Sequence, residues 1–63
     1  MDDYTAIGIA EGFIESESEQ QRIQAWQYLI DTGIAWTLQG WFGRTATQLI
    51  ATGICKPASE KEL

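Results

Sequence analysis

The side chains best suited to binding chemistry lie in one short aromatic segment and the residues that follow it. The rings of Trp36, Trp41 and Phe42 could stack on a nucleobase. Arg44 stands at the expected start of a helix, where its guanidinium and the free backbone amides could together bind a phosphate. The ligand-binding candidates, completed by two hydroxyl groups, are Trp36, Trp41, Phe42, Arg44, Thr45 and Thr47.

The same aromatic rings have two other possible uses. They could complete the hydrophobic core or a contact between subunits, which is the commoner role of large aromatic side chains. They could also meet a different protein. Because the chain has only 4 basic residues, a pocket for an anion would need arginines from more than one subunit. The nucleotide hypothesis therefore implies a site shared at an oligomer interface.

Catalysis is not expected from this sequence. The chain has no histidine, so it can form neither a Ser-His nor a Cys-His pair, and a zinc site built from Cys and His is excluded. Lys56 could lower the pKa of the neighbouring Cys55 thiol, but a packed, inert cysteine is the simpler interpretation. Glu15, Glu17 and Glu19 lack the ligand spacing of a calcium loop and read as a solvated helix start. We therefore expect no enzyme, no metal and no cofactor.

Length and charge limit the function classes further. The chain has 63 residues, a formal net charge of −5 and a single cysteine. A general DNA- or RNA-binding protein would be basic, because phosphate neutralisation dominates that affinity, whereas an acidic surface can suit a basic partner. No apolar run approaches the ~20 residues of a membrane span, and no signal peptide is visible. One unpaired cysteine without an export signal leads us to expect a reducing cytoplasm.

Two helices are expected in the first half of the chain. Apolar residues from Tyr4 to Ala10 recur at helical spacing after two acids that can cap a helix, and Gly12 is expected to end it. The central helix can begin at either of two overlapping capping boxes, Ser16 with Glu19 or Ser18 with Gln21. Its apolar stripe, at spacings of three and four residues, consists of Ile23, Trp26, Leu29 and Ile30.

A pattern of seven residues occurs twice, as Leu29 to Ala35 and again twenty residues later as Leu49 to Cys55. Each copy is typical of a helix end, with a glycine, Gly33 or Gly53, that can take the left-handed conformation. Between the copies, the alternating apolar residues of 34–42 predict a short β-hairpin or extended loop. A 3₁₀ or helical turn is the alternative. The last helix is expected over residues 44–50.

These elements predict a mainly α fold, a small domain of two to three helices with a short β-hairpin or aromatic loop between the last two. Residues 1–55 would form a single domain and residues 56–63 a flexible tail. A domain of this size buries only about 60% of its unfolded surface, so we expect a homo-oligomer, a dimer or higher. The expected interface residues are Ile23, Trp26 and Ile30, together with the aromatic segment.

Part of the chain resembles the junction between two ankyrin repeats. Between Leu29 and Ala51, Gly33 is followed at the family's interval by the run Gly43-Arg44-Thr45-Ala46. The resemblance implies that the Thr45 hydroxyl helps to fix the start of the last helix. It is local only, because aromatic and aliphatic side chains stand where ankyrins carry polar turn residues.

The stretch from Leu29 to Cys55, with Leu-Gln-Gly-Trp-Phe-Gly-Arg-Thr-Ala at its centre, also resembles a family of small uncharacterised bacteriophage proteins. That resemblance implies a viral accessory protein in the cytoplasm of an infected host bacterium. We therefore expect a non-enzymatic protein that acts by binding, as a counter-defence factor against a host defence protein. One alternative is a homo-oligomeric sponge that sequesters a cyclic nucleotide signal. Another is a structural or regulatory phage protein with no ligand.

Overall fold

Three α-helices form the molecule in a computed structural model that describes residues 1–58. They are α1 (Asp3–Glu11), α2 (Glu19–Thr32) and α3 (Gly40–Ala51), and a 3₁₀ turn, η1 (Ile34–Trp36), lies between the last two. Residues 1–58 contain no β-strand. The predicted mainly α fold is therefore confirmed.

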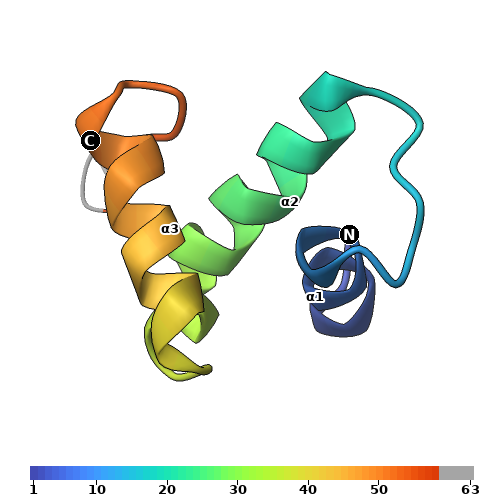
Figure 1. The fold of residues 1–63 in the computed structure, drawn as a ribbon, viewed down its shortest axis with the longest axis horizontal. Coiled ribbons are helices and arrows are strands. Elements are labelled where there is room, and N and C mark those ends of the chain that lie inside the picture. Colours follow the sequence, from blue (N-terminus) through green and yellow to red (C-terminus); the bar gives the residue numbers. More distant parts are fainter. Residues whose placement is uncertain (59–63) are drawn as a thin grey trace.

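The central helix α2 lies between the other two (Figure 1). Helix α1 is seen almost along its axis in this view, so it crosses α2 rather than running beside it. Helices α2 and α3 lie closest near η1 and diverge toward the start of α2 and the end of α3. This divergence leaves space between them that side chains fill only in part, as described below.

Both predicted helix starts are present, and the structure selects one capping residue at each. The Asp2 carboxylate accepts a hydrogen bond from the Thr5 amide at 2.8 Å. At α2 the Ser18 hydroxyl accepts one from the Gln21 amide at 3.1 Å. The Gln21 side chain reaches back to accept the Glu17 amide at 2.6 Å, which satisfies a second amide near the helix start.

The two copies of the repeated pattern end their helices as predicted. Gly33 and Gly53 have φ angles of 83° and 84°, in the left-handed region. Their amides donate to Ile30 at 3.1 Å and to Ile50 at 3.1 Å, respectively, and so close the last turn of each helix. The same arrangement at the two helix ends therefore explains why the seven-residue pattern occurs twice.

The β-hairpin predicted over 34–42 is not found, whereas the alternative of a 3₁₀ turn is. The Trp36 amide donates to Gly33 at 3.2 Å and the Thr37 amide to Ile34 at 2.9 Å, which makes a 3₁₀ turn instead of a strand. The Phe42 amide then donates to Gln39 at 2.9 Å, so the last helix begins at Gly40, earlier than expected. The aromatic segment is therefore divided between η1 and the first turn of α3.

The core joins all three helices and the segment after α3. The Gln27 side chain fixes this segment, donating to the Lys56 carbonyl at 2.7 Å and accepting the Lys56 amide at 2.8 Å. Residues 59–63 of the tail predicted at 56–63 lie outside the described residues. Among the described residues no helix is both long and apolar enough to cross a membrane. The buried residues of the core are Ala6, Ile9, Ala25, Trp26, Leu29, Ile30, Ala35, Phe42, Ala46 and Cys55.

Candidate functional site

Two of the predicted ligand-binding aromatics belong to a cluster centred on α2. The rings of Trp41 and Phe42 are stacked, with centroids 4.0 Å apart and planes at 29°. Trp26 contacts both, edge-on to Trp41 with centroids 6.3 Å apart and tilted against Phe42 at 5.7 Å. Phe42 is buried and Trp41 is 36% exposed. The cluster therefore holds α3 against α2, and only Trp41 offers part of a ring to a ligand.

Trp36 and Arg44 lie over the two glycines in the first half of α3. A Cβ added to Gly43 would lie 3.7 Å from Cε3 of Trp36, so the indole packs over the backbone of α3. Nη1 of Arg44 lies 3.1 Å from the position that a Cβ on Gly40 would take, so the guanidinium folds back toward the start of its own helix. Trp36 is 50% exposed.

The two predicted threonines point in different directions from α3. Helical residues follow one another at ~100°, which places Thr45 near Trp41 on one flank and Thr47 on the other. Thr45 lines a groove toward α2, whereas Thr47 is exposed. The structure thus brings Trp41 and Thr45 to one flank of α3. Trp36 and Arg44 lie instead against Gly43 and Gly40, on the side of α3 that also carries Thr47.

The groove on the Thr45 flank lies where α2 and α3 diverge and has a volume of about 420 Å³. Trp26 forms its base and is 5% exposed. A mixed pair of charges, Glu19 and Arg22, stands at the start of α2. The apolar walls come from Ile23, Leu49 and Ile54.

Two of the three predicted interface residues are used within the chain. Trp26 and Ile30 are 5% and 2% exposed, so they cannot give contact area to a second copy while the fold is intact. Only Ile23, which is half-buried and lines the groove, is accessible. The sequence showed an apolar stripe on α2, and the neighbouring helices of the same chain cover most of it.

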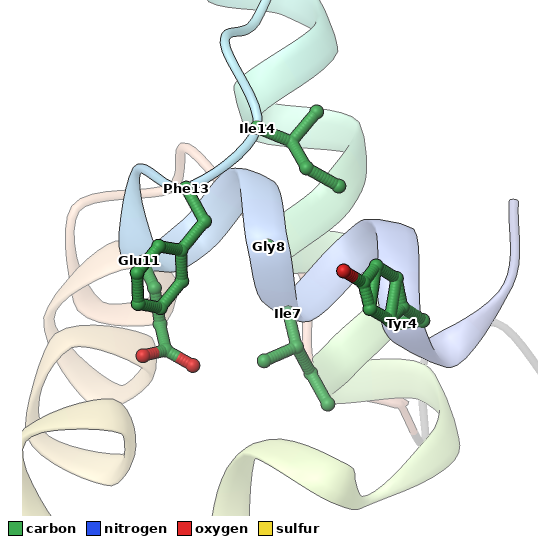
Figure 2. A pocket seen from close by; sticks show the side chains of 6 residues that line it. All are labelled: Tyr4, Ile7, Gly8, Glu11, Phe13 and Ile14. Carbon is green, nitrogen blue, oxygen red and sulfur yellow. The ribbon is translucent and has the colours of Figure 1, made fainter.

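The most exposed aromatic side chains lie on α1 and just after it, where the sequence suggested no site. Phe13 is 84% exposed and Tyr4 is 76% exposed. They stand at the two ends of a hollow of about 310 Å³, with Gly8 between them (Figure 2). Ile7 and Ile14 supply apolar walls and Glu11 projects beside the Phe13 ring. We call these six lining residues the α1 surface.

Local contacts hold the α1 surface in place. The Ile14 amide donates to the Gly8 carbonyl at 3.0 Å, which turns the chain back over α1. A Cβ on Gly8 would lie only 2.6 Å from Cδ1 of Ile14, so the absence of a side chain at Gly8 lets Ile14 pack there. The Tyr28 hydroxyl donates to the Asp3 carboxylate and ties the start of α1 to α2.

Hydrogen bonding shifts the pKa of two groups around α1. Bonds from the Thr5 side chain and amide lower the pKa of the Asp2 carboxyl below its usual value, since they favour the charged form. The hydrogen bond to Asp3 raises the pKa of the Tyr28 hydroxyl, since losing the proton would break that bond. The Asp2 carboxylate thus caps the start of α1, and the Asp3 carboxylate accepts a hydrogen bond from Tyr28 of α2.

The α1 surface lies in the acidic part of the chain. Six of the nine acidic residues precede Arg22, which is the first basic residue. Within the described residues, no basic side chain pairs with Glu11 or Glu15. The position of the acids along the chain was therefore a signal for this site that the sequence contained. The net charge alone did not reveal it, because it does not show where the acids lie.

Cys55 is placed as expected for a packed cysteine. Its side chain is 2% exposed, and its sulfur lies 3.9 Å from the Ile23 carbonyl oxygen. Burial, followed by the charge of Asp31, raises the pKa of the thiol, so the neighbouring lysine does not activate it. The described residues contain no group of side chains arranged to hold a metal ion.

Comparison with known protein families gives one match. Residues 8–62 match the model of a domain of unknown function, DUF7417. The chain belongs to this family. The match begins at Gly8, so it covers most of the α1 surface but not Tyr4 or Ile7. No curated protein and no solved structure matches the chain significantly.

Proposed function

We propose that this DUF7417 protein is a non-enzymatic accessory protein that acts by binding another protein through its α1 surface. The observation that carries the proposal is the exposure of Phe13 and Tyr4, at 84% and 76%, beside a hollow of about 310 Å³. Contiguous exposed apolar patches on small proteins mark interaction sites, and aromatic side chains are the usual anchors of protein interfaces.

We propose a bacteriophage origin and a host protein, most specifically a defence protein in the host cytoplasm, as the partner. The support for this part is the resemblance of residues 29–55 to small phage proteins. The nucleotide-sponge alternative has less support, because Phe42 is buried and the Trp41 ring is stacked on it, so little of either ring is left to stack on a base. A structural or regulatory role without a small ligand is compatible with the same binding surface.

We also propose that copies of the chain associate through the α3 side of the molecule. Trp36 and Trp41 are half and one-third exposed there, and residues 33–58 contain no Asp or Glu. Two copies can therefore meet on this side without carboxylates facing carboxylates. Sedimentation equilibrium should show a dimer that Trp36→Glu dissociates, and a wild-type monomer at every concentration would refute this association.

Affinity capture from a bacterial cytoplasm tests the main proposal when it is made with matched variants. Phe13→Ser removes the most exposed aromatic ring of the α1 surface. Ile54→Ser is the control, because it removes an exposed apolar side chain from the α2–α3 groove instead. The proposal predicts a partner that the wild type and Ile54→Ser capture, that Phe13→Ser loses, and that binds the purified wild-type chain directly. Equal capture by all three chains would overturn it.

A further inference from the structure

We infer that the α1 surface binds a basic amphipathic helix of its partner, an inference that rests on the proposed function and specifies its partner. The shape of the surface supports this inference. Tyr4, Ile7 and Glu11 follow one another at spacings of three and four along α1, so they form one stripe along the helix. Phe13 lies at the helix end of this stripe and Ile14 packs beside it over Gly8, so an elongated apolar segment can lie along the surface.

The carboxylates around the α1 surface indicate the charge of the partner. Asp2 is engaged at the helix start by Thr5, and Asp3 accepts the Tyr28 hydroxyl. The remaining carboxylates of this region are therefore the ones available to a partner. Glu11 lines the hollow itself, and the exposed Glu15 and Glu17 follow directly after Ile14. A partner that places apolar side chains on the stripe brings its flanking residues within reach of these carboxylates.

The charge of the α1 surface also decides among its possible occupants. Nucleic acids and anionic lipid surfaces are repelled by a region with six carboxylates and no Lys or Arg before Arg22. A second copy that meets this surface symmetrically would place its own acidic α1 surface against it, and the facing carboxylates would repel. A helix with leucine on one face and lysine or arginine on its flanks satisfies both the apolar stripe and the carboxylates.

The probe for this inference is a designed helical peptide made of leucine and lysine, labelled for fluorescence anisotropy. A peptide of the same pattern with glutamate in place of lysine is its counterpart. The inference predicts that the lysine peptide binds, that binding weakens as salt is added, and that the glutamate peptide does not bind. Phe13→Ser should weaken binding by at least about tenfold.

The charge contribution is tested separately from the aromatic one. Glu11→Gln with Glu15→Gln should weaken lysine-peptide binding several-fold and reduce its salt dependence. Asp31→Asn is the matched control: it neutralises a carboxylate near the end of α2, away from the α1 surface, and keeps the oxygen that accepts the Gln27 hydrogen bond, so it should leave binding unchanged. Circular dichroism of each variant establishes that it is folded, which is expected because Phe13, Glu11 and Glu15 are exposed.

The outcomes separate this inference from the proposed function. If neither peptide binds, or if the lysine peptide binds equally well to the wild type and Phe13→Ser, the inference is wrong. Capture of a cellular partner that still depends on Phe13 would then leave the proposed function standing. If the lysine peptide binds as described but cellular capture ignores Phe13, the surface chemistry is right and the proposed function is wrong.

Discussion

The substitution Gly8→Ala is expected to change the stability of the protein in opposite directions in the wild type and in an Ile14→Ala background. An added Cβ at Gly8 would lie 2.6 Å from Cδ1 and 2.8 Å from Cγ1 of Ile14, closer than carbon atoms pack. Alanine is favoured over glycine inside a helix by up to ~1 kcal/mol, whereas forcing an extra methyl group into a packed contact costs ~1–3 kcal/mol. Gly8→Ala should therefore destabilise the wild-type protein by about 1 kcal/mol.

Removing Ile14 should reverse that sign. In an Ile14→Ala background the two clashing carbons are gone, and the remaining Cβ of residue 14 would lie 3.5 Å away, an ordinary contact. Gly8→Ala should then stabilise the protein by up to ~1 kcal/mol, which gives a coupling free energy of about 2 kcal/mol between the two positions.

The assay is urea denaturation followed by circular dichroism for the four chains of this double-mutant cycle. Gly43→Ala is the control, because a Cβ there would meet Trp36 at 3.7 Å, an ordinary contact, and should leave stability unchanged or raise it. Equal effects of Gly8→Ala on stability in both backgrounds would show that Ile14 does not pack closely on α1 at Gly8.

Three further predictions concern the rest of the molecule. The pKa of the Asp2 carboxyl is lowered in the folded protein, so its capping contribution to stability is present above the pKa of the unfolded chain and is lost as pH falls through the pKa of the folded protein. Helicity should therefore decline below about pH 3.8, and it should decline less in Asp2→Asn, which has no carboxyl group at this position. The buried Cys55, with its raised thiol pKa, should react with a thiol reagent at neutral pH only after denaturation, and rapid reaction of the native protein would contradict its burial. Gln27→Ala removes two hydrogen bonds to the backbone of Lys56. It should lower the free energy of unfolding by about 1–2 kcal/mol, as measured by thermal unfolding. An unchanged unfolding midpoint would show that these bonds do not stabilise the segment after α3.

The helix boundaries that could be predicted from the sequence are those set by local hydrogen bonds. Ser18 and Gly33 act on amides and carbonyls within a few residues, so their roles follow from residue type and position alone. The start of α3 could not be predicted this way. Gln39 makes no side-chain capping bond, so the sequence around Gly40 carries no capping signal.

The sequence left a hairpin and a 3₁₀ turn open over 34–42 for a related reason. Apolar alternation at Ile34, Trp36 and Leu38 favours a strand, but a 3₁₀ turn also produces a short apolar run. Ala35, which stands between Ile34 and Trp36, is fully buried. Tertiary contacts with α2 and α3 decided the conformation, and a pattern of five residues does not contain them.

The sites were harder to predict than the fold because exposure depends on which faces the helices cover. Trp26 and Ile30 belong to the apolar stripe of α2 and are buried in a single copy. Phe13 follows a glycine stop and belongs to no periodic stripe, yet it is the most exposed large apolar side chain of those described. The charge distribution around it was legible in the sequence, while its exposure required the fold.

Amide chemical shifts measured by NMR during titration with the leucine–lysine peptide test the central claim most directly, because they show where on the chain a partner helix lies. The account predicts that shift changes concentrate in residues 4–17, on α1 and the acidic segment after it, with little change along α3. Changes concentrated at Ile23, Thr45, Leu49 and Ile54, in the groove between α2 and α3, would contradict it.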